Sequence, residues 1–160
     1  MGLDSYLRKK PYIRTWKTGT SGIDDAVKAT VVVDLTFKDG TKAQETHTVF
    51  DPGSGIEIVL PVCYWRKANA IHRWFVDNCA DGVDDCKPVY VPYEKLVELR
   101  DICKQIMADH SKAKELLPTQ SGFFFGSTDY DEWYYQDIEK TAAALTNIED
   151  GVSYEYQASW

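Results

Sequence analysis

A polar stripe near the middle of the chain combines residue types that bind anions and move protons. Arg66, Asn69 and Arg73 recur at intervals of three and four residues, which would put them on one side of a helix. Two guanidinium groups and an amide in a row can hold a phosphate or a carboxylate. His72 lies in the same stretch and titrates near neutral pH, so it could act as a general acid or base. The pattern predicts a site for a small phosphorylated ligand, flanked by Trp65.

The same stripe also has a structural interpretation, and the residues alone leave both open. The histidine could be hydrogen-bonded at the edge of the core. The arginines could form an ion-pair network with Asp129, Asp131 or Glu132 if the first and last predicted helices pack together.

An aromatic stretch at 116–135 is the second candidate binding surface. Three consecutive phenylalanines stand between Gly122 and Gly126, and alternate side chains of an extended segment point to opposite sides. The phenylalanines of 123–125 therefore cannot all face the core. Core packing is one interpretation of these aromatic side chains, and stacking on a base or contact with a partner is the other. The candidates for contact are Phe124, Tyr130 and Trp133.

Three helices are expected to position these groups. Apolar residues spaced by three and four predict a helix over 63–79 that carries the polar stripe, and Pro92 opens a second helix over 93–109. Asp129 and Glu132 resemble a capping box, which predicts a third helix over 129–148. The residues expected to face inward are Tyr64, Ala68, Ile71, Phe75 and Cys79 in the first helix, Leu96, Leu99, Cys103 and Ile106 in the second, and Tyr134, Ile138, Leu145 and Ile148 in the third.

Strands are expected before and after the helices. The valine-rich segment 29–38, the Asp39-Gly40 turn and segment 41–50 predict a hairpin, and 55–62 would extend it to an antiparallel meander. Shorter strands are expected near 11–16 and 88–91, and a last strand over 152–157 would join the meander. The sequence therefore predicts one α+β domain over 1–160, with an antiparallel sheet, formed by the early meander and the C-terminal strand, packed against about three helices.

Charge and hydropathy exclude several classes of function. The 160 residues carry a net charge of −7, which argues against direct binding to the phosphates of nucleic acids. No apolar run approaches the roughly 18 residues of a membrane span, and the first residues lack the apolar segment of a signal peptide. The cytoplasm is the expected location.

No metal or cofactor is expected from the motifs. The four cysteines form no C-x-x-C pair, so zinc is not predicted. Cys79 and Cys86 could be bridged in an oxidising compartment, but free thiols are expected in the cytoplasm. The acids between Asp77 and Asp85 do not match the calcium-loop spacing, and no nucleophile elbow or phosphate-binding glycine loop occurs.

Two motifs resemble a known group of proteins. YWRKANAIHRWF (64–75) and LLPTQSGFFFGSTDYDEWYYQDI (116–138) are similar to stretches of small, mostly uncharacterised proteins of tailed bacteriophages and prophages, as are the opening MGLDSYL and the closing YEYQASW. Residues 17–60 carry no part of this likeness. The resemblance implies a phage origin and no particular catalytic residue.

Phage origin favours a non-enzymatic binding protein that inhibits or sequesters a host component, such as an anti-phage defence factor, in the host cytoplasm. The expected partner is then a host protein, and self-association stays open. The alternative is binding or hydrolysis of a small nucleotide at Arg66, Asn69, His72 and Arg73. A third hypothesis, an assembly role, has no supporting motif. An exposed apolar or acidic patch without a deep pocket would favour the first hypothesis, and a concave site containing an arginine the second.

Overall fold

The computed structural model describes residues 2–15, 28–50 and 56–160. Contacts between its residues group the chain into two compact units. Unit 1 comprises Met1–Pro11 and Val59–Trp160, and unit 2 comprises Tyr12–Ile58. The α+β class predicted from the sequence is confirmed, because an antiparallel sheet of four strands packs with helices.

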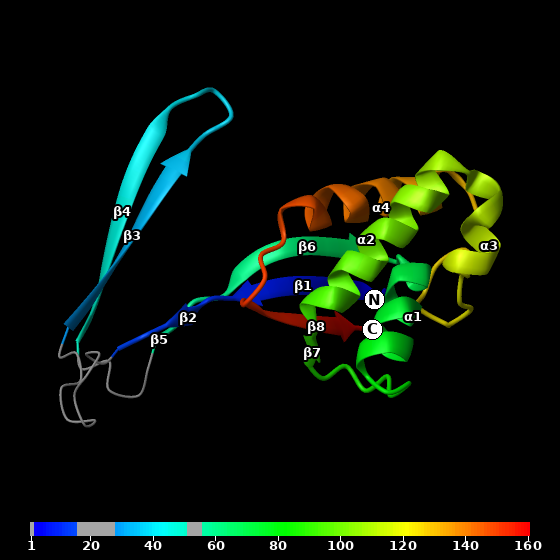
Figure 1. Ribbon diagram of the computed structural model, residues 1–160, viewed down its shortest axis with the longest axis horizontal. Helices are drawn as coiled ribbons and strands as arrows, with labels where there is room; N and C mark the ends of the chain where they lie inside the picture. The colour runs from blue at the N-terminus through cyan, green and yellow to red at the C-terminus, as the bar shows by residue number, and fades with distance from the viewer. Residues whose placement is uncertain (1, 16–27, 51–55) are drawn as a thin grey trace. The chain divides into compact units, whose positions relative to one another are not determined.

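The sheet of unit 1 has the strand order β6-β1-β8-β7, and every neighbouring pair is antiparallel (Figure 1). The strands are β1 (Asp4–Lys10), β6 (Leu60–Arg66), β7 (Val89–Val91) and β8 (Ser153–Ser159). Burial alternates along β8, where Tyr154, Tyr156 and Ala158 are buried and their neighbours are not. One face of the sheet therefore belongs to the core, and the other carries polar pairs such as Arg8 with Gln157.

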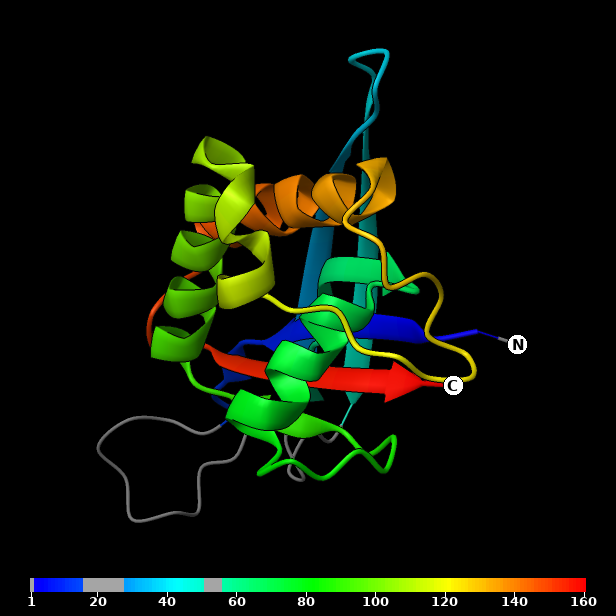
Figure 2. The same cartoon turned by 90° about the vertical axis from the view of Figure 1, so that its right-hand side faces the viewer.

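Helices cover the buried face of this sheet (Figures 1 and 2). They are α1 (Asn69–Cys79), α2 (Tyr93–Ala108), α3 (Ala113–Leu116) and α4 (Glu132–Ala144), with 3₁₀ turns at His110–Lys112 and Leu145–Asn147. The four residues expected to face inward from the second helix are all buried, and Pro92 stands just before its first turn. The predictions for 88–91, 93–109 and the C-terminal strand are thus confirmed to within a few residues.

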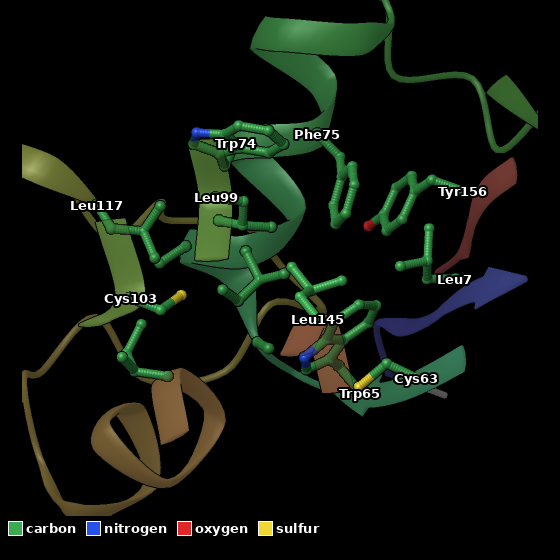
Figure 3. Close-up of a cluster of buried hydrophobic side chains, with 14 of the residues drawn as sticks. Leu7, Cys63, Trp65, Trp74, Phe75, Leu99, Cys103, Leu117, Leu145 and Tyr156 are labelled. Atoms are coloured by element: carbon green, nitrogen blue, oxygen red, sulfur yellow. The ribbon is translucent and has the colours of Figure 1, made fainter. Parts of the chain in front are cut away.

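The core lies between the sheet and the helices, and aromatic side chains fill much of it (Figure 3). The rings of Phe75 and Tyr156 stack with their centroids 4.1 Å apart. Trp65 is fully buried, and its indole Nε1–H donates to Thr141 Oγ1 at 2.8 Å. Because the indole has a partner, Trp65 can contribute the full benefit of burial, about 2–3 kcal/mol for a large apolar side chain.

The composition of the sheet differs from the prediction. The early meander does not contribute its hairpin to the four-stranded sheet, since β3 (Lys28–Thr36) and β4 (Lys42–Phe50) pair only with each other among the described residues. The C-terminal strand instead pairs with β1 and β7. The sequence hides β1 because four of its seven residues are charged and Ser5 takes an inward position, so its alternation is not apolar against polar.

The predicted third strand divides into two. Ile56–Glu57 (β5) pairs with Tyr12–Ile13 (β2), which lies within the predicted 11–16 strand. Leu60–Arg66 (β6) then pairs with β1.

The first helix begins six residues later than predicted. Cys63 and Trp65 are buried, whereas Tyr64 and Arg66 are exposed, and this alternation is that of a strand. Lys67 has a φ of 60°, which ends the strand before α1 begins at Asn69. Tyr64 and Ala68 have the spacing of a helical turn, but Tyr64 lies in β6 and Ala68 is the N-cap of α1. The stripe from Arg66 to Arg73 is therefore divided between a strand and a helix and does not lie on one helix.

The last helix begins three residues later than its predicted capping box. Asp131, not Asp129, is the N-cap, and its carboxylate accepts a hydrogen bond from the Tyr134 backbone N–H at 3.1 Å. Ser127 and Asp129 instead bond to each other in the preceding loop. Tyr134, Ile138 and Leu145 are buried as predicted.

Candidate functional site

A cavity of about 480 Å³ lies where β6, α1, the loop before α4 and α4 itself meet in unit 1. Both sequence stretches that resemble phage proteins contribute to its wall, although they are about 50 residues apart in the chain. The cavity is concave and mixed in character, as small-molecule sites usually are. Its lining residues with polar or aromatic side chains are Arg66, Lys67, Asn69, Thr119, Ser127, Asp129, Asp131, Trp133, Tyr134, Gln136 and Asp137.

Asn69 holds the two sides of this cavity together. Its Nδ2 donates to the carbonyl oxygens of Phe125 and Ser127, at 3.0 and 2.7 Å, and its Oδ1 accepts from the Gln120 N–H at 2.9 Å. Asn69 is also buried. Because its amide is already bonded on both sides to the backbone, Asn69 positions the loop rather than offering free donors to a ligand.

The cationic side of the cavity consists of Arg66 and Lys67. Neither side chain forms a salt bridge or hydrogen bond with another residue in the described part of the chain. The predicted ion-pair network between Arg66 and Asp129 or Asp131 is therefore absent there, although all three residues line the cavity. Uncompensated cations beside a cavity are available to an anionic group.

The acidic side of the cavity contains Asp129 from the preceding loop, Asp131 at the N-cap of α4 and Asp137 within α4. Burial raises the pKa of Asp137 to about 6, Lys140 lowers it, and the nearby charge of Asp131 raises it. Within the described residues the Asp137 carboxylate accepts no hydrogen bond. A desolvated carboxyl without a partner favours a ligand group that donates hydrogen bonds.

Aromatic side chains complete the wall. Trp133 is 74% exposed, so its indole face is open to stacking. Tyr134 is buried, and its hydroxyl donates to the Leu117 carbonyl at 2.9 Å. Tyr130 is half-buried outside the cavity lining, and its hydroxyl accepts from the Thr119 N–H at 3.3 Å. Of the aromatic candidates from the sequence, Trp133 is thus the one that lines the cavity.

The structure separates the predicted polar stripe. Arg73 lies away from this cavity and forms an ion pair with Asp77 at 3.3 Å, one turn further along α1. Trp65 belongs to the core. Phe124 is half-buried, and its carbonyl accepts from the Leu3 N–H. Arg66 and Asn69 remain together at the cavity.

His72 occupies a different, smaller cavity with Tyr156 and Asp84. Its Nδ1 lies 2.8 Å from the Tyr156 hydroxyl, and its Nε2 lies 2.9 Å from Asp84 Oδ2. A carboxylate can only accept, so Nε2 carries a proton, and in the neutral imidazole Nδ1 then accepts from the tyrosine hydroxyl. Trp160 Nε1 donates to the second oxygen of Asp84. This buried network matches the structural interpretation of His72 and ties α1 to β8.

The lining residues that the sequence does not indicate as ligand contacts include three charged ones, Lys67, Asp131 and Asp137. Lys67 falls within the helix predicted over 63–79, whereas its left-handed backbone places it at the corner between β6 and α1. The sequence indicates Asp131 only as a possible ion-pair partner of the arginines. Asp137 shares the helix face of Tyr134, and the sequence signal was an acid three residues from a buried aromatic residue.

Other chemistry finds little support in the described residues. No group of three or more histidine, cysteine, aspartate or glutamate side chains is arranged there to hold a metal ion. The four cysteines are free, and burial raises the pKa of Cys63 and Cys79 to about 11 and that of Cys103 to about 12, so these three thiols stay protonated. None of the described helices is long and apolar enough to cross a membrane.

Comparison with known proteins adds no relative to this picture. The chain matches no protein-family model, no curated protein and no solved structure.

Proposed function

We propose that this chain is a phage-encoded, non-enzymatic binding protein that sequesters a small phosphorylated molecule of the host, with nucleotides as the favoured class. The observation that carries the proposal is the cavity of about 480 Å³ lined by Arg66 and Lys67, two cations without a salt-bridge partner among the described residues. A phosphate group can accept charge-assisted hydrogen bonds from both.

The remaining lining supports a nucleotide rather than inorganic phosphate. Trp133 offers an exposed aromatic face for a base, and Asp137 offers an acceptor for base N–H groups. A ligand with an anionic end and a hydrogen-bond-donating ring satisfies both sides of the cavity. The resemblance to tailed-phage proteins supports a setting in the cytoplasm of an infected bacterium, where defence-signalling nucleotides are candidate ligands.

Calorimetric titration of mono-, di- and cyclic nucleotides tests the proposal. We expect at least one of them to bind the wild-type protein, and Arg66→Ala to weaken its binding by about 10- to 100-fold, the value of one charge-assisted hydrogen bond. Arg73→Ala is the matched control, since Arg73 is an arginine of the same unit that does not line the cavity. The affinity of the Arg73→Ala variant for the nucleotide should stay within about twofold of the wild-type value.

The proposal is contradicted if the wild-type protein binds no nucleotide of the panel, or if Arg66→Ala and Arg73→Ala bind alike. Trp133→Ala separates stacking from charge. This variant should weaken the binding of nucleotides by roughly 1–3 kcal/mol and leave the binding of inorganic pyrophosphate unchanged.

Capture of a host protein is the second candidate function, and one observation favours it. Phe123 is 96% exposed at the tip of the turn closed by the Phe125 N–H and the Gly122 carbonyl. Large exposed aromatic residues are frequent anchors of interfaces. Under this hypothesis a host partner recovered with the wild-type protein is lost with Phe123→Ser and retained with Phe50→Ser, a control at another exposed phenylalanine. Equal recovery with both variants would contradict it.

A further inference from the structure

Among the described residues, the hairpin of unit 2 is a two-stranded sheet to which no third strand pairs. Its strands β3 and β4 pair along nine residues each, from Lys28 opposite Phe50 to Thr36 opposite Lys42. No backbone of another described residue pairs with either outer edge. Every residue of β4 is exposed, and none of β3 is buried. An isolated two-stranded sheet is marginally stable in water, and its free edges are templates for further pairing.

The side chains of β3 are segregated by face. Its odd-numbered positions are all apolar, namely Ala29, Val31, Val33 and Leu35, whereas the even-numbered positions carry Lys28, Thr30, Val32, Asp34 and Thr36. β-branched residues dominate the centre of the strand, which favours strand pairing. The free edge of β3 carries no proline and no central charge to block such pairing.

The same strand is complementary to a second copy of itself. In an antiparallel pair centred on Val32, Val31 faces Val33 of the other copy, Ala29 faces Leu35, and Thr30 faces Asp34. All nine positions are then paired. Lys28 also lies diagonally across from Asp34 of the other copy, within reach of a long side chain. Shifting the register by two residues moves the centre of the pair to Val31 or Val33 and leaves two positions of each strand without a partner.

We propose that two copies of this chain associate through antiparallel pairing of their β3 strands, centred on Val32, into a continuous four-stranded sheet β4-β3-β3-β4. The occupant of this edge is a second copy because, in this register, the apolar positions of β3 face apolar positions of the other copy and each Lys28 approaches the Asp34 of the other copy. The pairing gives each hairpin the additional strands that an isolated pair lacks. It involves only unit 2 and is independent of the ligand proposed for the cavity.

The centre of symmetry provides a specific test, because Val32 of one copy would lie opposite Val32 of the other. Val32→Lys and Val32→Glu each place like charges directly across the interface, and such pairs destabilise strand pairing. We expect the wild-type protein to sediment as a dimer at tens of micromolar and each variant alone as a monomer. An equimolar mixture of the two variants should sediment as a dimer again, since lysine then faces glutamate. Val32 is half exposed, so both variants should keep the fold.

Thr46 is the matched control, because it is exposed and pairs with Val32 within the hairpin. The Thr46→Lys and Thr46→Glu variants should remain dimers. A monomeric wild-type protein, a dimer unaffected by either Val32 variant, or charge rescue at Thr46 instead of Val32 would each overturn the proposal. The last result would assign the interface to β4.

Discussion

At the scale of single residues, His72 shows how a catalytic residue type can serve structure alone. The side chain is 1% exposed, and both ring nitrogens are hydrogen-bonded, to Tyr156 and to Asp84. Its ring also meets that of Phe125 edge-on. Every polar atom of the imidazole is therefore committed to the fold, and no ring nitrogen is free for a substrate.

The hydrogen bonds of His72 predict a graded loss of stability. His72→Ala removes buried ring contacts and one hydrogen-bond partner each of the Tyr156 hydroxyl and of Asp84, so we expect a loss of ~2–4 kcal/mol in the free energy of unfolding. Tyr156→Phe removes only the donor to Nδ1 and should cost ~1–2 kcal/mol. Urea unfolding measures both. His110→Ala, at an exposed histidine of the same unit, should change stability far less, and an equal loss there would contradict the assignment.

Asp137 predicts a stability change with a defined pH window. Burial raises its pKa to about 6 in the folded state, above the ordinary aspartate value near 3.9. The folded protein therefore holds the proton more tightly than the unfolded chain does. The contribution of Asp137 to folding is most favourable below about pH 4 and becomes less favourable as the pH rises through about 6.

Asp137→Asn removes this charge. Because the side chain is partly exposed, we expect a gain of only about 1–2 kcal/mol in the free energy of unfolding at pH 8, and a much smaller gain at pH 4.5. Urea unfolding at the two pH values measures the difference. Glu139→Gln, an exposed acid on the same helix, should show no such dependence. If Asp137→Asn stabilises the protein equally at both pH values, the effect does not come from a buried charge.

At the scale of elements, the cavity depends on the loop between α3 and α4. Asn69 bonds to three backbone groups of this loop, and Gly126 has a φ of 85° beside Lys67. A Cβ at Gly126 would lie 3.1 Å from Lys67 Cβ, so glycine allows both the turn and the close approach. The loop therefore reaches α1 through specific contacts rather than through apolar packing alone.

Asn69→Asp tests this positioning role. A carboxylate cannot donate to the Phe125 and Ser127 carbonyls, so two hydrogen bonds are lost and oxygen atoms face one another. We expect a loss of ~2–3 kcal/mol in the free energy of unfolding, together with weaker ligand binding. Asn147→Asp, at an exposed position of the same unit, provides the control in urea unfolding. Unchanged stability of Asn69→Asp would show that the loop does not need this clamp.

The elements also show which features the sequence could predict. α2 was predicted closely because apolar spacing, Pro92 and a polar outer face all indicate the same helix. β1 is not predicted because most of its residues are charged, although it is a central strand of the sheet. Long charged side chains can lie along a sheet and still place their charged groups in solvent. The cavity was predicted only in part, because Arg66 and Asp137 meet through tertiary packing that no local period encodes.

At the scale of the whole molecule, unit 2 is an insertion in a hairpin of unit 1. β1 and β6 are antiparallel neighbours with Lys9 opposite Leu60, and the chain between them forms unit 2. The described core lies in unit 1, since 24 apolar residues are buried there and none of them belongs to 12–58. Unit 1 thus has the hydrophobic core that an autonomous fold requires.

Replacement of Tyr12–Ile58 by a short Asn-Gly linker should therefore leave unit 1 folded. Lys9 lies opposite Leu60, so Pro11 and the linker would form a three-residue hairpin loop that contains glycine, which is a common type. The shorter connection also lowers the entropic cost of closing the loop. Circular dichroism and thermal unfolding should show a cooperative transition at a similar or higher temperature. Ligand binding should persist, while the dimer proposed for the wild-type protein should disappear. A shortened chain that fails to unfold cooperatively would show that unit 1 needs the insertion.

The most direct test of ligand sequestration is mass spectrometry of small molecules released by heat from the tagged protein after expression in infected cells. We predict that the wild-type protein and Arg73→Ala release the same phosphorylated compound in similar, near-stoichiometric amounts, and that Arg66→Ala releases at least tenfold less. If the wild-type protein releases no phosphorylated compound, or if Arg66→Ala releases as much as the wild-type protein, the cavity does not have the function proposed for it.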